Sequence, residues 1–394
     1  MSAPSIGVAV IGAGMAGRAH AAGYRSAPTL YQPDLPEIRL VAIADINRDF
    51  AADTARRYGY ERAETDWRAI AEADDIDVVS VVVANHLHRE ILEALLAGGK
   101  HVLCEKPLAP TTEDAEAMIA AAKRVPDKLA SVGFTFRRSP AIAAIKEQVE
   151  RGAIGRPVHF NGHYWCDYGC DPNGPMSWRY KGRPGSGALS DIGSHLIDAA
   201  EFICGPIRSI RGAVLSTTVT KRPVPLGTVV GHAAAAVISE KREPVENEDL
   251  VTFAASFESG ATGTFSASRV AFGLPNSLGF ELFGEKGAAT FDLARAGEFG
   301  FADGAPDAVT NGYRQVLVGP FHPNFAKGMA MDFPGCNYSQ NDLFVFQARA
   351  FLEQVAGLNR LPPCPTLEDG LRNLRLIAAV VRSAERGGGE VEIG

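Results

Sequence analysis

The sequence lacks any long run of lysine or arginine, and its 39 basic side chains are outnumbered by 46 acidic ones, giving a formal charge of -7. Without clustered positive charge, a nucleic-acid or anionic-membrane surface is not expected. No apolar run is long enough to span a bilayer. Residues 1–5 show no basic segment leading into a cleavage site, so we expect a cytoplasmic protein without a secretion signal. A small-molecule ligand is therefore the expected partner.

Cysteine is also scarce, and the six cysteines do not form a disulfide framework. They are Cys104, Cys166, Cys170, Cys204, Cys336 and Cys364. Scattered cysteines are typical of reduced thiols in a cytoplasmic protein. Cys166 and Cys170 lie near His163, but their spacing is not that of a zinc knuckle and no second Cys/His pair follows. We therefore expect no metal.

What the chain does have is length and apolar content. Its 394 residues are 46% hydrophobic and 22% charged, which allows a large core and excludes wholesale disorder. Internal repeats and sizeable low-complexity segments are missing. This length favours two domains over one.

A glycine motif opens the first domain. The apolar strand Ile6–Ile11 runs directly into Gly12-Ala13-Gly14-Met15-Ala16-Gly17 and an alanine-rich helix. This order is the dinucleotide fingerprint, in which the first glycine makes the turn, the second admits the pyrophosphate and the third allows close helix packing. The predicted cofactor contacts here are Gly12, Gly14, Met15, Ala16 and Gly17.

An acidic residue indicates which dinucleotide is bound. Asp45 follows the next strand, Ile38–Ala44, where a carboxylate accepts hydrogen bonds from ribose hydroxyls and repels a ribose phosphate. The distance from Gly17 exceeds the usual ~20 residues, and a proline-punctuated insertion over 27–36 accounts for the excess. We therefore expect NAD. NADP stays an alternative, because Arg48 lies close to Asp45 in the sequence and could support NADP binding.

Strand and helix signals continue to alternate up to residue 134, which predicts a doubly wound parallel sheet with ligands at the carboxyl ends of its strands. The strands are 78–83, 101–104 and 129–134, and a helix capped near Thr111 or Thr112 precedes the last. Two polar segments follow strand ends, Asn85-His86-Leu87-His88 and Glu105-Lys106-Pro107. We place the first domain at 1–136.

The pattern changes in residues 137–394. A helix over 140–152 is followed by predicted strands at 158–165, 207–216, 250–257, 261–268, 278–283 and 313–318, with a hairpin turn at 257–260. Short turns favour an antiparallel sheet, one face of which must be covered by helices or by another subunit. Terminal helices are expected near 342–357 and 366–386, the last of which is free to pack back on the first domain. Covering the open sheet face favours a homodimer or homotetramer.

A third motif carries acid–base chemistry. Asp191 and His195 stand four residues apart behind the glycine-rich Gly185-Ser186-Gly187, so they share one face of a predicted helix. A neutral imidazole accepts a hydroxyl proton near pH 7, and a neighbouring carboxylate stabilises the imidazolium. Lys106, at a strand end, is placed to stabilise a developing oxyanion. A surface pair or helix cap is the alternative for Asp191 and His195, and a snorkelling strand-end lysine is the alternative for Lys106.

Taken together, Gly12–Gly17, Glu105-Lys106-Pro107 and Asp191-Ile192-Gly193-Ser194-His195 with Asp198 resemble the ordered signature of the Gfo/Idh/MocA family. The resemblance covers essentially the whole chain. It implies a Rossmann domain, a C-terminal α/β domain with a large open antiparallel sheet, and an active site in the cleft between them. It also implies a cis peptide before Pro107.

The resemblance assigns roles to individual residues. Lys106 contacts the reacting hydroxyl, His195 is the acid/base and Asp191 is its partner or a substrate ligand. The implied cofactor contacts beyond the glycine motif are Asp45, Asn85, His88, Glu105, Lys106, Trp178 and Arg179. Because a hydroxyl-rich substrate needs several polar anchors, we also expect substrate contacts from Lys106, His163, Arg179, Asp191 and His195, with Asn161, Tyr164, Asp167 and Asp198 as further candidates. For most of these anchors the alternative is a loop or strand residue that faces solvent. Ala84, Thr135 and Ser186 depart from the family pattern without touching the catalytic set, and 171–179 looks most like the branch of levoglucosan and other pyranose-type dehydrogenases.

We therefore expect an NAD-dependent oxidoreductase acting on a secondary hydroxyl of a sugar, sugar derivative or cyclic polyol. Two alternatives stay open. One is a glycosidase-type enzyme that oxidises its substrate transiently with tightly held NAD, and the other is a catalytically silent ligand sensor.

Overall fold

The computed structural model describes residues 5–30, 35–227, 237–303, 310–325, 331, 333 and 335–394. The chain forms two compact units. Unit 1 comprises Met1–Arg138 with Gly319–Leu374, and unit 2 comprises Ser139–Val318 with Arg375–Gly394. A division into folding domains after residue 136 stays a prediction. Among the described helices, none is both long and apolar enough to cross a membrane.

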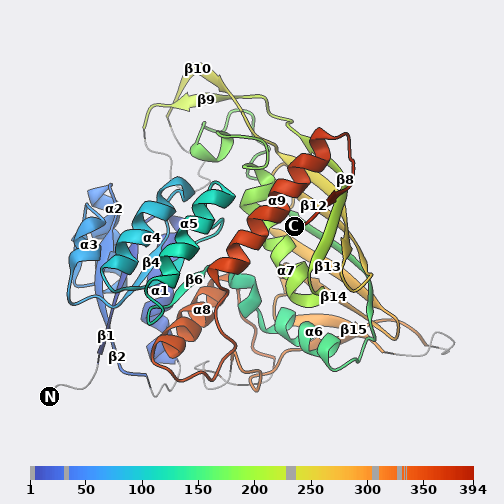
Figure 1. Cartoon of the computed structure of the whole chain (residues 1–394), viewed down its shortest axis with the longest axis horizontal. Coiled ribbons are helices and arrows are strands. Elements are labelled where there is room, and N and C mark those ends of the chain that lie inside the picture. The colour runs from blue at the N-terminus through green and yellow to red at the C-terminus, as the bar shows by residue number, and fades with distance from the viewer. Residues whose placement is uncertain are drawn as a thin grey trace. The chain divides into compact units, whose positions relative to one another are not determined.

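Unit 1 contains a six-stranded parallel sheet in the order β3-β2-β1-β4-β5-β6. The strands are β1 (Ser5–Ile11), β2 (Glu37–Ala44), β3 (Arg62–Glu64), β4 (Val78–Val81), β5 (His101–Cys104) and β6 (Ala130–Val132). The helices are α1 (Met15–Leu30), α2 (Arg48–Tyr58), α3 (Arg68–Glu72), α4 (His88–Ala97), α5 (Thr112–Lys123), α8 (Gln340–Val355) and the beginning of α9 (Leu367–Glu385) (Figure 1). This strand order confirms the predicted dinucleotide-binding fold.

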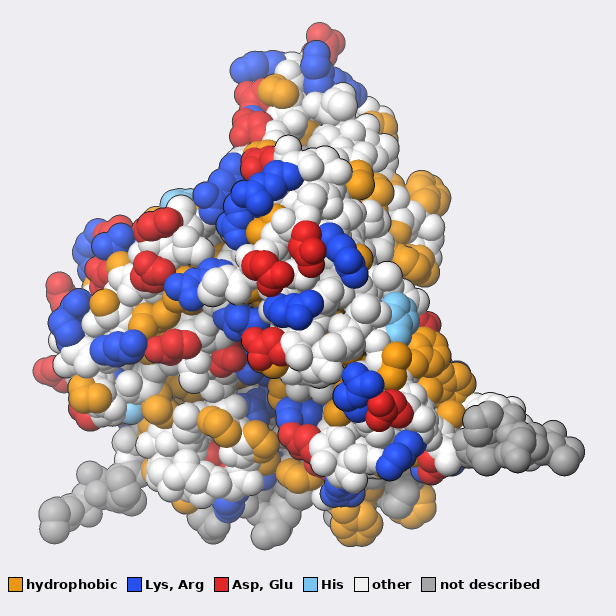
Figure 2. Space-filling model, turned by 45° about the vertical axis from the view of Figure 1, so that its right-hand side comes forward, with side chains coloured by type: hydrophobic (Ala, Val, Ile, Leu, Met, Phe, Trp, Pro, Cys, Tyr) orange, Lys and Arg blue, Asp and Glu red, His pale blue; other side chains and the backbone are white. Residues whose placement is uncertain are grey.

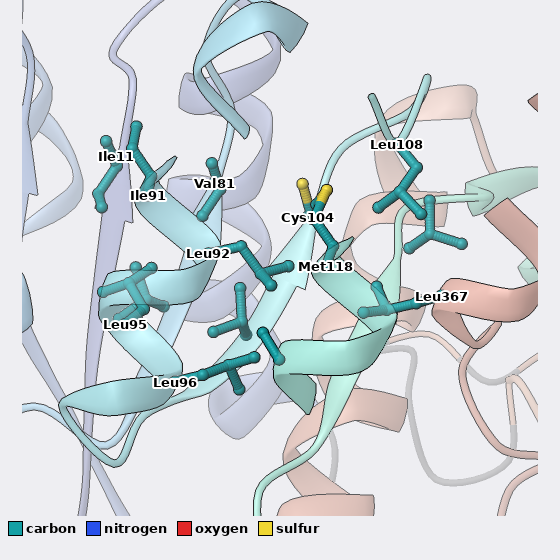
Figure 3. Close-up of a cluster of buried hydrophobic side chains, with 14 of the residues drawn as sticks. Ile11, Val81, Ile91, Leu92, Leu95, Leu96, Cys104, Leu108, Met118 and Leu367 are labelled. Carbon is teal, nitrogen blue, oxygen red and sulfur yellow. The ribbon is translucent and has the colours of Figure 1, made fainter. Parts of the chain in front are cut away.

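The core of unit 1 lies between the parallel sheet and helices α4, α5 and α9. Leu92 and Leu96 of α4, Met118 of α5 and Leu367 of α9 are buried in one apolar cluster with the sheet (Figure 3). Thr111 caps α5 by accepting a hydrogen bond from the Asp114 N–H, as predicted. The sequence predicted an insertion over residues 27–36. The structure differs from this in part, because α1 continues to Leu30 with Pro28 in its last turn. Residues 31–34 lie outside the described residues.

Unit 2 contains a nine-stranded mixed sheet in the order β16-β15-β14-β13-β7-β12-β11-β8-β17. These strands are β7 (Pro157–Trp165), β8 (Ile207–Ser216), β11 (Leu250–Phe257), β12 (Thr262–Ser268), β13 (Ser277–Gly284), β14 (Ala288–Asp292), β15 (Glu298–Ala302), β16 (Arg314–Leu317) and β17 (Val391–Glu392). β9 (Lys221–Pro225) and β10 (Ile238–Pro244) form a separate hairpin, and the helices are α6 (Pro140–Glu150), α7 (Ser194–Cys204) and the rest of α9 (Figure 1). The mainly antiparallel prediction is confirmed, with one exception: β7 and β12 pair in parallel.

The register of this sheet places α7. Phe253, Phe265, Phe280 and Phe291 form a buried aromatic row across β11, β12, β13 and β14, with Gly162 of β7 in the middle. A Cβ on Gly162 would lie 2.5 Å from the Phe160 ring and 2.8 Å from Leu196 Cδ1. Glycine here therefore lets α7, which carries His195, pack closely on the sheet.

Candidate active site

The glycine motif adopts the geometry that the dinucleotide fingerprint requires. Gly12 has a φ of 105°, and a Cβ there would lie 2.0 Å from the Val82 carbonyl oxygen. A Cβ on Gly17 would lie 1.8 Å from the Gly12 oxygen, whereas one on Gly14 would meet nothing within 4 Å. Gly12 and Gly17 thus allow close packing, and Gly14 leaves open space before the N-terminus of α1, where Met15 is half exposed. These features fit a bound pyrophosphate.

Asp45 joins two loops at the same edge of the sheet. Its Oδ2 accepts a hydrogen bond from the Ala13 N–H at 2.7 Å, and its Oδ1 accepts one from the Asn47 N–H at 2.8 Å. Each carboxylate oxygen retains further acceptor capacity for a ribose hydroxyl. The carboxylate is therefore held rigidly at the position where the sequence analysis expected it.

The polar segments after β4 and β5 lie at this edge too, because β4 and β5 are neighbouring parallel strands. Asn85 begins a short 3₁₀ turn that leads into α4. His88 is buried, and its ring nitrogens each lie 3.1 Å from a carbonyl oxygen, those of Leu108 and Val83. Burial lowers the pKa of His88, and a neutral ring donates to one of these oxygens. The side chain therefore braces the loop from within, and direct contact with cofactor stays a prediction.

Glu105 and Lys106 follow β5, and the Lys106-Pro107 peptide is cis, as the resemblance implied. The Glu105 carboxylate accepts hydrogen bonds from the Lys106 N–H at 3.1 Å and pairs with His20 Nε2 at 2.8 Å. Burial acts to raise the pKa of Glu105, but the hydrogen bond from His20 and the Lys106 charge outweigh it and lower the pKa. Glu105 is therefore an anion at neutral pH.

In unit 2, Asp191 lies in a π-helical turn. The sequence predicted one continuous helix through Asp191 and His195, but residues Leu189–Gly193 are π-helical and α7 starts only at Ser194. The Ser194 hydroxyl donates to the Ser190 carbonyl oxygen at 2.8 Å, within this wider turn. Single π turns are frequent at functional sites, since they redirect a side chain. Asp191 and His195 still belong to successive turns of one helical segment.

Two side chains anchor the Asp191 carboxylate. The Tyr168 hydroxyl donates to Asp191 Oδ2 at 2.6 Å, and Arg179 Nε lies 3.8 Å from the same oxygen. Burial, followed by the charge of Asp191, raises the pKa of Tyr168 well above its usual value, so the phenol stays protonated. The Arg179 guanidinium in turn lies over the Trp178 ring. The structure thus brings Asp191, Arg179 and Trp178 together and adds Tyr168, which the sequence analysis missed.

His163 is not part of this group. Neighbouring residues of a strand point to opposite faces, and Tyr164, whose ring centroid lies 6.2 Å from that of His195, faces α7. His163 instead lies on the other face of the sheet, where it stacks on Trp165 at 3.8 Å and packs over Gly279. Asn161 shares that outer face and bonds Glu281. We therefore leave His163 and Asn161 out of the proposed substrate site, because the strand alternation turns them away from His195.

The glycine-rich loop before Asp191 is held by a segment that the sequence analysis did not single out, Glu246–Asp249. Glu248 is buried, and its two carboxylate oxygens accept hydrogen bonds from the Gly185 N–H at 2.7 Å and the Leu189 N–H at 3.1 Å. Burial raises the pKa of Glu248. A Cβ on Gly187 would lie 2.2 Å from the Glu248 carbonyl oxygen, so glycine is needed for this approach.

The other residues of Glu246–Asp249 hold the Arg179 region. The Asn247 amide donates to the carbonyl oxygens of Arg179 and Lys181 at 3.0 and 3.2 Å. Asp249 forms a fully buried ion pair with Arg269 at 2.8 Å, and Arg269 also donates to the Arg179 carbonyl oxygen at 2.8 Å. The backbone on both sides of the Asp191 anchor is therefore fixed by this one segment.

Breaking the Asp249–Arg269 pair should strongly destabilise the protein. Asp249→Asn leaves a buried guanidinium without its anion, which costs about 3–5 kcal/mol in the free energy of unfolding. Chemical denaturation followed by circular dichroism measures this loss. Asp53→Asn, in an exposed ion pair with Arg56, is the matched control and should change the midpoint far less. Equal shifts for the two variants would contradict the assigned strength of the buried pair.

Removing the Tyr168 hydroxyl should slow the reaction. Tyr168→Phe deprives Asp191 of a hydrogen bond to a charged group, worth about 1.5–3 kcal/mol, or roughly 10- to 100-fold in turnover. Steady-state kinetics over a range of pH measures the effect. Tyr180→Phe, which removes a hydroxyl from a ring packed between Arg222 and Arg269, is the control and should be near normal. Unchanged kinetics in Tyr168→Phe would show that the Asp191 anchor is dispensable.

Comparisons with known proteins identify the family of the chain. Residues 6–134 match the model of the oxidoreductase family with an NAD-binding Rossmann fold, and residues 142–290 match the GFO/IDH/MocA C-terminal domain. The chain is 37% identical over 393 residues to levoglucosan dehydrogenase of Pseudarthrobacter phenanthrenivorans, covering 97% of each protein. Myo-inositol 2-dehydrogenase of Thermotoga maritima is 27% identical, covering 73% of this chain and 75% of the relative.

Solved structures extend the likeness to three dimensions. Levoglucosan dehydrogenase in complex with NADH and levoglucosan superposes with a TM-score of 0.88 at 34% identity, covering 99% of this chain and 100% of that chain. Its complex with NADH and L-sorbose gives the same TM-score at 35% identity, covering 99% of each chain. The chain described here belongs to the GFO/IDH/MocA family of NAD-binding oxidoreductases.

Proposed function

We propose that the protein oxidises a secondary hydroxyl group of a pyranose-type sugar or anhydrosugar with NAD. The observation that carries this proposal is the anchored Asp191, one helical turn before His195, in a chain of which 97% aligns with levoglucosan dehydrogenase. Sugar derivatives and cyclic polyols are the wider substrate class, since a myo-inositol dehydrogenase is also among the relatives.

In the proposed mechanism, His195 takes the proton of the substrate hydroxyl as general base. Asp191, held by Tyr168 and Arg179, keeps a negative charge near the imidazolium that forms. The Lys106 ammonium stabilises the oxygen of the same hydroxyl as negative charge develops on it. When bound, NAD supplies the hydride acceptor, and the open space at Gly14 with the acceptors of Asp45 would hold its pyrophosphate and ribose.

A substrate panel tests this function. Purified protein is mixed with levoglucosan, other anhydrosugars, pyranoses and inositols, with NAD and NADP in separate arms, and nicotinamide absorbance is followed. NADH formation with a pyranose-type substrate supports the proposal. Release of free sugar from a glycoside without NADH accumulation would instead indicate the glycosidase-type alternative, and ligand binding without turnover would indicate a sensor.

We further propose that a second copy of the chain covers the outer face of the large sheet. This face carries Trp165 and the exposed side chains of Phe283 and Val214. Hydrophobic side chains are visible along the right-hand side of Figure 2. Light scattering coupled to size-exclusion chromatography should give a dimer or tetramer. Phe283→Asp should shift it toward the monomer, and a monomeric parent protein would overturn this expectation.

A further inference from the structure

A buried chain of hydrogen bonds inside unit 1 ends at the residue before Lys106. Tyr24 and His20 come from α1, Ser80 comes from β4 and Glu105 follows β5. Tyr24 and Ser80 are 0% exposed and His20 is 3% exposed. Burying three polar side chains next to a Glu105 side chain that is only 12% exposed is costly unless these groups satisfy one another.

The distances make the chain continuous. The Tyr24 hydroxyl lies 2.9 Å from Ser80 Oγ, Ser80 Oγ lies 3.1 Å from His20 Nδ1, and His20 Nε2 lies 2.8 Å from Glu105 Oε1. The other carboxylate oxygen, Oε2, accepts the Lys106 N–H at 3.1 Å. The Phe344 ring of α8 makes an edge contact with the His20 ring, and the two ring centroids are 5.3 Å apart.

One arrangement of protons satisfies every group in the chain. Burial raises the pKa of Tyr24 strongly, so its hydroxyl remains protonated and donates to Ser80. A His20 ring that carries its proton on Nε2 accepts a hydrogen bond from the Ser80 hydroxyl at Nδ1 and donates its Nε2–H to Glu105. Every donor points toward the carboxylate, which is the one charged acceptor of the chain. Such directed hydrogen bonds to an anion are short and strong.

The backbone at Gly133 also confines the Glu105 carboxylate. A Cβ on Gly133 would lie 2.7 Å from Glu105 Oε1 and 3.0 Å from its carboxyl carbon. Gly133 itself is fixed by donating its N–H to the Cys104 carbonyl oxygen at 2.8 Å. The carboxylate therefore lies against both the His20 ring and the Gly133 backbone and has little freedom to turn away from the Lys106 N–H.

We propose that His20 is a positioning residue for Lys106, acting through the Glu105 carboxylate that holds the Lys106 backbone. The inference rests on the role of Lys106 in the proposed function. Tyr24 and Ser80 contribute by fixing the tautomer of His20 through their hydrogen bonds to each other and to its Nδ1. A change at α1, inside the glycine-motif helix, is thus transmitted to the end of β5 through contacts within one unit.

Two His20 variants test the proposal. His20→Leu fills a similar volume but removes both ring nitrogens, and we expect kcat to fall about 10- to 100-fold, as a misplaced reacting group commonly causes. His20→Gln keeps an amide N–H within reach of Glu105 and should recover most of the loss. The NAD dissociation constant, measured by fluorescence quenching, and the thermal midpoint should change little. His101→Asn, which keeps an acceptor for the Leu129 N–H, is the matched histidine control.

Gly133→Ala provides an independent test, because its methyl group displaces the carboxylate while every group of the chain is still present. We expect kcat to fall as in His20→Leu, with NAD binding retained. A His20→Leu variant with parental kcat would overturn the proposal. A second result would also overturn it. If both His20 variants lose NAD binding or fail to fold while Gly133→Ala keeps parental kcat, the role of His20 is structural. Lys106→Met is measured in parallel: if it keeps parental kcat, the role of Lys106 in the proposed function fails, and if it alone is inactive, only the positioning role of His20 fails.

Discussion

His195→Asn should lower kcat by about 10²–10⁴-fold, the range expected when a general base is removed. Asparagine fills much of the imidazole volume but cannot accept a proton near neutral pH. The hydroxyl proton then has to leave to solvent, so the residual rate should rise with pH without a plateau in the neutral range. Steady-state kinetics across pH, with the best substrate from the panel, measures both effects.

Binding measurements separate chemistry from folding in this variant. His195 is not among the predicted cofactor contacts, so NAD affinity should stay near the parental value, and an unchanged thermal midpoint would show that the fold is intact. His101→Asn controls for the loss of a histidine as such. Parental turnover in His195→Asn would remove His195 from the mechanism.

Lys106→Met should lower kcat and kcat/KM together by about 10²–10³-fold, which is the usual effect of removing one donor to a developing oxyanion. Methionine keeps the length of the apolar stem and removes the ammonium group. An equal drop in both constants is the signature of an interaction made in the transition state, whereas a rise in KM alone would indicate a binding contact.

Lys123→Met on α5 is the matched control, because this lysine is largely exposed and pairs only loosely with Glu368 at 3.7 Å. It should be indistinguishable from the parent protein. If Lys106→Met retained parental kcat while His195→Asn lost it, the charge on the oxygen would have to be stabilised by another group. Arg179, which already lies close to Asp191, would then be the next variant to make.

Much of the fold could be predicted from the sequence where local pattern and tertiary structure agree. The strand predicted at 101–104 and those at 207–216 and 250–257 have the observed bounds, because apolar runs ended by turns or charges mark them clearly. The predicted turn at 257–260 is present, with Gly260 at a φ of 85°. The short strands β3, β9, β10, β14, β15 and β17 were not predicted, since strands of two to seven residues with mixed polarity have little periodic signal.

The candidate site was predictable only as far as its residues form motifs. Asp191, Lys106 and the glycines carry a spacing signal, and the structure places Lys106 and the glycines at strand ends as expected, whereas Asp191 lies in a π turn and not in a continuous α-helix. Tyr168 lies in a loop without periodicity, and its contact with Asp191 depends on a fold that brings residues 23 positions apart together. The side of the sheet on which His163 lies depends on strand register, which a motif cannot specify.

The segment Glu246–Asp249 has a consequence for redesign of the protein. Its side chains and backbone clamp a loop some 60 residues earlier in the chain, at Gly182, Gly185 and Leu189. Transplanting residues 171–189 from a relative to alter substrate preference would therefore separate the loop from its clamp. Residues 171–189 and Glu246–Asp249 should therefore be exchanged together. A single-residue insertion ahead of β11 should break the hydrogen bonds between the two segments, even if the grafted loop fits the new substrate.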